Sequence, residues 1–266
     1  MHNLRSYGAP PYRVAVIHGG PGAAGEVAPV ARELSAERGV LEPLQTAHSL
    51  QGQVEELRAV LETHAALPVT LVGHSWGAWL AYLVAAQYPA LVGKLILVSS
   101  GAFEEAYVAQ LQATRLGRLS ERERAEWQAI LRALDDPASP EKDRLLARLG
   151  ALAARTDSYD PLPDEGGGPD ATGVQGDIYQ RVWQAAAELR RSGELLALGA
   201  RVRCPVVAIH GDYDPSPVEG VYKPLSTVLQ YFRLILLERC GHTPWLERQA
   251  REAFYCVLRE ELDARE

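Results

Sequence analysis

Cysteine, methionine and phenylalanine are scarce in this chain of 266 residues, which holds three, one and three of them respectively. The cysteines are Cys204, Cys240 and Cys256, and their spacing matches neither a C-x-x-C pair nor a zinc site. The sequence therefore predicts no disulfide framework and no structural metal. It also contains no pattern that implies an organic cofactor.

An excess of basic residues and a long apolar run are also missing. The formal net charge is -7, which argues against nucleic acid or an anionic membrane surface as the main partner. No apolar run approaches the roughly 18 residues that a membrane-spanning helix needs. The first residues lack the basic-then-apolar order of a signal peptide. We therefore expect a cytoplasmic protein that acts on a small molecule or a short peptide. The oligomeric state stays open.

Short runs rich in β-branched residues alternate with helical patterns along much of the chain. This alternation is typical of an α/β protein whose parallel sheet is covered by helices on both faces. The expected strands are 13–18, 39–45, 69–73, 94–100, 206–211 and 233–238.

From residue 102 to 203 the strand pattern stops and helical patterns rich in Arg, Glu, Ala and Leu replace it. We expect a core domain formed by residues 1–101 and 204–266, with residues 102–203 inserted as a helical cap between two core strands.

The segment L-V-G-H-S-W-G-A contains G-x-S-x-G, with Ser75 at its centre. An expected strand precedes it and a long apolar helical pattern follows, which is the context that a nucleophile elbow requires. Such a turn exposes the serine at the carboxyl edge of the sheet. A serine hydroxyl is a weak nucleophile, so it needs a base and a group that orients the base.

The ends of the last two expected strands carry the candidates for those two roles. His242 follows the last strand and is the candidate base, because ligands meet at the carboxyl ends of the strands in open α/β sheets. Two carboxylates follow the preceding strand. Asp214 lies far enough into the loop to reach His242, whereas Asp212 is placed to cap the turn. We predict a Ser75–His242–Asp214 triad.

The segment H-G-G-P-G, at 18–22, follows the first expected parallel strand and carries three glycines. A phosphate cradle, a tight turn or an anion-stabilising loop would each explain that density of glycine. The pattern is neither G-x-G-x-x-G nor G-x-x-x-x-G-K-[ST], so the phosphate cradle is disfavoured.

Together, H-G-G-P-G, G-H-S-W-G, H-G-D-Y-D and the later G-H resemble the α/β-hydrolase superfamily over the whole chain. Within it, H-G-G-P-G with S-W-G resembles the proline iminopeptidase branch, although that branch has glycine where this chain has His74. The resemblance implies an α/β-hydrolase fold. The family has two extra N-terminal strands, whereas only about a dozen residues precede the first expected strand here, so we expect a trimmed, mostly parallel sheet of about six strands. It also implies that the backbone N–H groups of Gly20 and Trp76 form an oxyanion hole.

These observations predict a serine hydrolase that cleaves an ester, lactone or amide bond of a small molecule through an acyl-enzyme. An iminopeptidase-like aminopeptidase and a non-catalytic ligand-binding protein on the same fold are the alternatives. Candidates for substrate contact are His74, Trp183 and Tyr179, for which plain packing is the alternative role. Four acids could hold a substrate amino group or form a solvated loop: Asp157, Asp160, Asp164 and Glu165.

Overall fold

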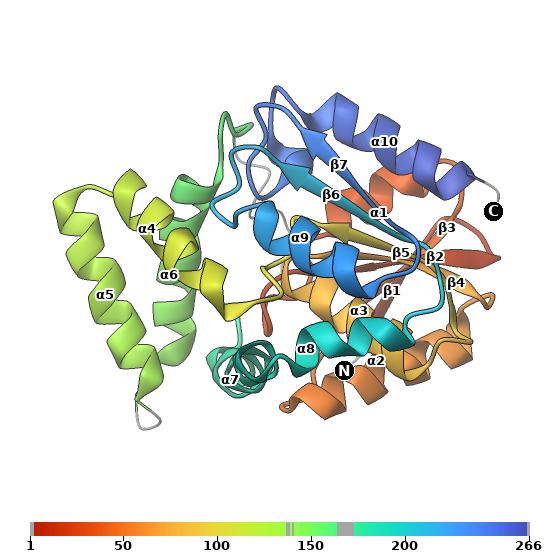
Figure 1. Ribbon diagram of the computed structural model, residues 1–266, viewed down its shortest axis with the longest axis horizontal. Helices are drawn as coiled ribbons and strands as arrows, with labels where there is room; N and C mark the ends of the chain where they lie inside the picture. The colour runs from red at the N-terminus through yellow and green to blue at the C-terminus, as the bar shows by residue number, and fades with distance from the viewer. Residues whose placement is uncertain (1–2, 137–138, 140, 164–172, 265–266) are drawn as a thin grey trace.

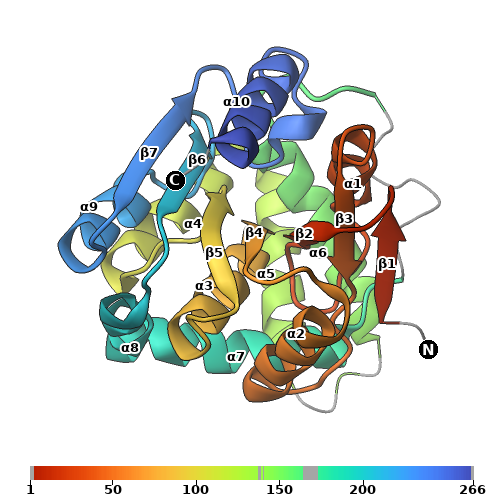
Figure 2. The same cartoon turned by 90° about the vertical axis from the view of Figure 1, so that its right-hand side faces the viewer.

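The computed structural model describes residues 3–136, 139, 141–163 and 173–264. Within them, seven strands form one sheet in the order β1-β3-β2-β4-β5-β6-β7 (Figure 1; Figure 2). The strands are β1 (Leu4–Tyr7), β2 (Tyr12–Ile17), β3 (Gly39–Pro43), β4 (Val69–His74), β5 (Val92–Val98), β6 (Val206–Gly211) and β7 (Phe232–Leu237).

The six strands from β2 to β7 run parallel to their neighbours and confirm the six strands expected from the sequence. The expectation of about six strands omits β1, which pairs antiparallel with β3, Leu4 opposite Pro43 and Tyr7 opposite Val40. The four residues L-R-S-Y are too short and too polar to produce a buried-strand pattern, because an edge strand needs no apolar run.

Helices cover both faces of this sheet. On one face lie α1 (Ala28–Leu34) and α10 (Arg251–Asp263), and on the other α2 (Leu50–His64), α3 (Trp76–Gln87) and α9 (Glu219–Val228). Almost every residue of α3 is buried, as its uniformly apolar sequence predicts for a helix packed deeply on a sheet. The architecture is the α/β-hydrolase fold that the sequence predicts.

Between β5 and β6 the regular elements that the structure describes are helices, apart from an isolated antiparallel bridge between Pro161 and Glu247. The helices there are α4 (Val108–Arg118), α5 (Glu121–Asp135), α6 (Lys142–Asp157), α7 (Gly176–Ser192) and α8 (Glu194–Ala197). The first three form a group beside the sheet with a small core of their own, which includes Leu119, Trp127 and Leu152 (Figure 1). In contrast, α7 packs its apolar face against α2 and the large apolar cluster around α3.

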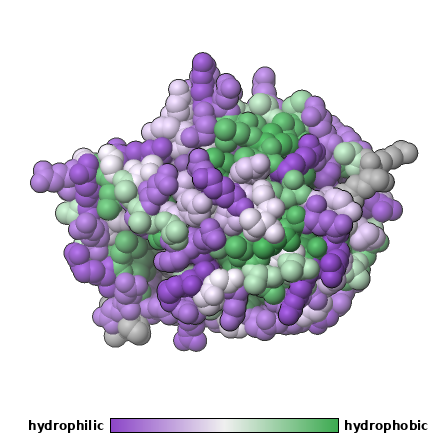
Figure 3. All heavy atoms as spheres, in the orientation of Figure 1, coloured by the Kyte–Doolittle hydropathy of each residue, from purple (hydrophilic) through white to green (hydrophobic). Residues whose placement is uncertain are grey.

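Strand β7 forms the edge of the sheet opposite β1 (Figure 2). Apolar side chains gather over this part of the surface, and Leu236 is 48% exposed (Figure 3). No helix in the described parts of the chain is both long enough and apolar enough to cross a bilayer.

Candidate active site

Ser75 stands between the end of β4 and the start of α3, at the carboxyl edge of the sheet. Its φ of 52° lies in the left-handed region, which an ordinary side chain rarely adopts. A Cβ at Gly73 would lie 2.3 Å from the Gly77 carbonyl oxygen, and one at Gly77 would lie 2.4 Å from the Ile17 carbonyl oxygen. Both glycines of G-x-S-x-G are thus required by the close packing of this turn, which leaves Ser75 partly exposed.

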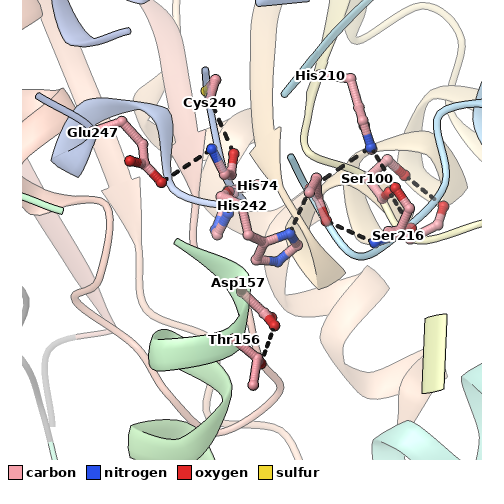
Figure 4. A network of polar contacts seen from close by, with 12 residues as sticks. His74, Ser100, Thr156, Asp157, His210, Ser216, Cys240, His242 and Glu247 are labelled. Atoms are coloured by element: carbon pink, nitrogen blue, oxygen red, sulfur yellow. Dashed lines mark hydrogen bonds and ion pairs between the residues drawn. The ribbon is translucent and has the colours of Figure 1, made fainter. Parts of the chain in front are cut away.

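Asp214 and His242, of which Figure 4 labels His242, meet at the same edge of the sheet. Nδ1 of His242 donates to Oδ2 of Asp214 at 2.8 Å, and the Asp214 side chain is fully buried. The other Asp214 oxygen accepts the backbone N–H of Ser216 at 2.9 Å. By contrast Asp212 is exposed and accepts the backbone N–H of Cys240 at 3.1 Å. Cys240 lies on another loop, so this contact differs from the expected role of Asp212 as a cap of its own turn.

These contacts shift the pKa values of both groups. Burial alone would raise the pKa of Asp214, but the neighbouring His242 and His210, together with the hydrogen bonds, lower it to about 2. Burial acts to lower the pKa of His242, yet the charge and hydrogen bond of Asp214 outweigh it and raise that pKa. Asp214 is therefore ionised and holds the imidazole with Nδ1 protonated, which leaves Nε2 for a proton transfer.

One predicted oxyanion donor, Gly20, lies on the glycine loop, and the other, Trp76, follows Ser75 directly in the chain. Gly20 has a φ of +55°, so its backbone conformation favours glycine. Trp76 is the first residue of α3, and the helix itself does not use its backbone N–H. The Trp76 side chain points into the core, where its indole N–H donates to Gln53 Oε1 at 3.3 Å.

His74 lies inside the protein, with a 3% exposed side chain. Its ring packs edge-on against Trp245 at 4.7 Å between centroids and lies 4.9 Å from the His242 ring. Nε2 of His74 contacts the carbonyl oxygen of His242 at 2.9 Å. These contacts are all with protein groups, and substrate contact by His74 stays a prediction.

Trp183 and Tyr179 project from α7 and form a stack with Trp79 of α3. The Trp79 and Trp183 rings are 5.8 Å apart and inclined by 3°, and the Trp183 and Tyr179 rings are 6.2 Å apart and inclined by 8°. Both α7 residues are partly exposed. The stack joins the inserted helices to the helix that follows Ser75, and a substrate contact by either residue is still a prediction.

Of the four acids proposed to hold an amino group, Asp157 contacts the candidate base through its backbone. Its backbone carbonyl accepts the N–H of His242 at 2.7 Å. Its carboxylate is 6% exposed and accepts two hydrogen bonds from Arg115, at 3.0 and 2.5 Å. Asp157 is thus neutralised by a cation of the protein. Asp160 is bonded to Gln249, whereas Asp164 and Glu165 lie outside the described residues.

Two further acids belong to the site, and the sequence analysis missed both. Glu247, which Figure 4 labels, is fully buried. It accepts the backbone N–H groups of Gly241, Tyr159 and Asp160 at 3.0, 2.8 and 2.8 Å. It joins the His242 loop to the end of α6. Glu26 accepts the backbone N–H of Gly19 at 3.1 Å, beside the glycine loop. A hydrogen bond to a backbone N–H requires no particular partner residue, so it cannot be recognised in a sequence. The position of these acids close to the motifs was the one available signal.

The described residues contain no cluster of three or more His, Cys, Asp and Glu side chains that could hold a metal ion. The arrangement offers the groups that acid–base chemistry needs: a serine in a strained turn, an imidazole oriented by a buried carboxylate, and the predicted donors Gly20 on the glycine loop and Trp76 at the start of α3.

The sequence of this chain also matches a known protein family. Residues 4–254 match the alpha/beta hydrolase family. No curated protein matches the sequence.

Solved structures with the same fold include three with hydrolytic names. A 2-hydroxy-6-oxo-6-phenylhexa-2,4-dienoate hydrolase from Rhodococcus is 21% identical with a TM-score of 0.62, and the match covers 98% of this chain and 94% of that one. An enol-lactonase from Burkholderia xenovorans is 17% identical with a TM-score of 0.61, over 98% and 96%. A proline iminopeptidase from Mycobacterium smegmatis is 18% identical with a TM-score of 0.60, over 97% and 93%. At these identities the likeness concerns the fold.

Proposed function

We propose that this chain, which belongs to the alpha/beta hydrolase family, is a serine hydrolase that cleaves an ester or lactone bond of a small molecule. The observation that carries the proposal is the 2.8 Å hydrogen bond between the buried Asp214 and His242, at the sheet edge where Ser75 sits in its strained turn. A ligand-binding protein on this fold would need neither the strain at Ser75 nor a buried carboxylate aimed at an imidazole.

In the proposed reaction, Nε2 of His242 takes the hydroxyl proton of Ser75 as the serine oxygen attacks the substrate carbonyl carbon. The carbonyl oxygen gains the negative charge, which the N–H groups of Gly20 and Trp76 stabilise. His242 then gives its proton to the departing alcohol oxygen as the bond to carbon breaks, leaving the acyl group on Ser75. Water repeats the two steps and releases the acid, while Asp214 stabilises the imidazolium each time.

The choice of an ester or lactone over a peptide rests on Asp157. An aminopeptidase needs a free carboxylate to hold the substrate's amino group, and Arg115 already takes both oxygens of Asp157. Aminopeptidase activity therefore remains the second candidate, supported by the H-G-G-P-G and S-W-G motifs and by the fold of the Mycobacterium smegmatis iminopeptidase.

We further propose that the inserted helices of residues 102–203 act as a cap that shapes the substrate site. Two contacts support this role. The N–H of Gln175, just before α7, donates to the carbonyl of Gly22 at 2.8 Å, and the end of α6 is bonded to the N–H of His242. The cap thus contacts both the glycine loop and the loop of the candidate base.

A fluorophosphonate probe tests the nucleophile, because it reacts with an activated serine. We expect labelling of the wild-type protein at Ser75, located by peptide mass spectrometry, and none in Ser75→Ala. The variant should also lose hydrolysis of p-nitrophenyl esters while its melting temperature stays within a few degrees. A folded wild-type protein that takes no label would favour the ligand-binding alternative.

A substrate panel tests the bond that is cleaved. It consists of p-nitrophenyl esters, lactones and aminoacyl-β-naphthylamides, assayed on the purified protein. We expect the largest kcat/KM among the esters and lactones. A preference for the aminoacyl compounds would instead identify an aminopeptidase.

A further inference from the structure

Glu26 and His74 form an ion pair between three loops of the candidate site. One oxygen of Glu26 accepts the N–H of Gly19 at 3.1 Å, and the other lies 3.1 Å from Nδ1 of His74. The opposite nitrogen of the His74 ring, Nε2, lies 2.9 Å from the carbonyl oxygen of His242. The pair therefore connects the glycine loop, the residue before Ser75 and the loop of the candidate base.

The contacts define how the His74 ring is held. A carbonyl oxygen only accepts, so Nε2 must carry a proton to bond the His242 carbonyl. Nδ1, on the opposite side of the ring, lies 3.1 Å from the Glu26 carboxylate. The ring is therefore held between the glycine loop and the loop of the candidate base, beside the position where the oxyanion would form.

Glu26 is ionised under all ordinary conditions. Burial would raise its pKa, but the positive charge of His74 outweighs burial and lowers that pKa to about 2. The pair is also tightly enclosed by the loop it contacts. A Cβ at Gly19 would lie 2.7 Å from both a Glu26 oxygen and Nδ1 of His74, so the glycine is required for the loop to approach the pair.

We propose that Glu26 and His74 are positioning residues, which fix the glycine loop and its Gly20 N–H relative to Ser75 and His242. This inference rests on the proposed function, because the aim of an oxyanion donor matters only if an oxyanion forms. An unpaired carboxylate next to such a donor would repel the negative charge that develops on the substrate oxygen. Paired with His74, Glu26 holds the loop without adding a net charge to it.

Glu26→Ala tests the proposal by removing the contact with Gly19. Complete removal of an oxyanion donor costs on the order of 100- to 1000-fold in kcat. A donor that is loosened should cost less, and we expect kcat on a p-nitrophenyl ester to fall about 10- to 100-fold with KM within about twofold. The melting temperature should change little. Glu62→Ala, which removes an exposed acid from the far end of α2, is the matched control and should leave kcat unchanged.

Glu26→Gln separates positioning from charge. The amide oxygen can accept the Gly19 N–H, and the amide nitrogen can donate to a neutral His74 that keeps its proton on Nε2. We therefore expect E26Q to recover most of the kcat that E26A loses. An E26Q variant as slow as E26A, with a raised KM for cationic esters, would overturn the proposal and assign Glu26 to holding a substrate cation.

His74→Phe removes both polar contacts of His74 and keeps a ring against Trp245. We expect its kcat to fall as in E26A, and the double variant E26A/H74F to be no slower than either single variant, because the two residues act as one unit. Additive losses would refute the pairing.

Hydrogen exchange of the loop gives a readout that does not depend on activity. Backbone amides of residues 16–22 should exchange faster in E26A than in the wild type, and E26Q should restore their protection. Failure of the proposed function would appear in the wild type, as an absence of fluorophosphonate labelling and ester hydrolysis. Failure of the positioning proposal would appear as an active wild type with E26A equal to it in kcat and exchange.

Discussion

Replacing Glu247 tests how strongly the segment that follows α6 holds the loop of the candidate base. The buried carboxylate accepts three backbone N–H groups, two on one oxygen and one on the other. Hydrogen bonds to a charged group contribute about 1.5–3 kcal/mol each. Glu247→Ala removes all three, but water can reach the partly exposed segment at Tyr159 and Asp160. We therefore expect the free energy of unfolding to fall by about 3–5 kcal/mol rather than by the full sum.

Glu247→Gln gives a finer measure of the same contacts. Its amide oxygen can still accept from Gly241 and Tyr159, while its amide nitrogen would face the N–H of Asp160. The buried amide nitrogen and the partly exposed N–H of Asp160 then face each other as two donors, and leaving the buried one unpaired costs about 1–3 kcal/mol. Urea unfolding followed by tryptophan fluorescence measures both variants, with kcat measured below the transition. Because Gly241 precedes His242, we expect kcat to fall in E247A even where the protein is folded.

The control for this series is Glu252→Gln, which changes an exposed acid on α10. We expect it to stay within about 0.5 kcal/mol of the wild type. A loss below about 1 kcal/mol for E247A would refute the reasoning, since it would mean that the three contacts contribute almost nothing. An unchanged kcat in folded E247A would show that the position of His242 does not depend on the hydrogen bonds of Glu247.

Three further outcomes are expected. In ester hydrolysis, Asp214→Asn should lower kcat by at least 1000-fold and Asp212→Asn by less than about tenfold. The reason is that only Asp214 is hydrogen-bonded to His242. The reverse order would transfer the acid role to Asp212. His242 must be neutral to act as the base, so its pKa sets the acidic limb of kcat/KM. Burial acts to lower that pKa, but the charge of Asp214 outweighs burial and raises it, so the limb should lie above pH 6.5 in the wild type. In Asp214→Asn the limb should move to lower pH, as burial then acts without the opposing charge, and a limb that stays in place would refute this cause. Trp183→Ala should cost about 3–5 kcal/mol in urea unfolding, because it removes a ring stacked on both sides; a cost under 1 kcal/mol would mean that the stack is not a structural contact.

The sheet and the motif loops could be predicted from the sequence because both depend on local pattern. Buried parallel strands need continuous apolar runs, and each predicted run forms a strand of the sheet. The strand at Leu4–Tyr7 could not be predicted, because its pairing with β3 uses backbone groups and its side chains are half exposed. The placement of Asp214 beside His242 followed from strand ends meeting at one edge of a parallel sheet.

The contacts that join the inserted helices to the candidate site could not be predicted from the sequence. Arg115 and Asp157 are far apart in the chain and pair only because α4 and α6 lie against each other. From the sequence alone, Asp157 would be taken for a free carboxylate in an acidic stretch. Glu26 and Glu247 would likewise be taken for solvated acids, because the fold brings them to the backbone N–H groups that they accept.

The position of the insertion also determines the order in which the protein can be assembled during translation. Strand β5 lies inside the sheet, between β4 and β6, yet all the helices of the insertion are synthesised before β6. At about 5–20 residues per second, the apolar edge of β5 lacks its partner strand for several seconds or longer while the ribosome completes the insertion. A nascent chain in that interval carries the Ser75 turn but neither Asp214 nor His242. Its hydrophobic edge is then a natural contact for chaperones, and it becomes covered only when the last quarter of the chain emerges.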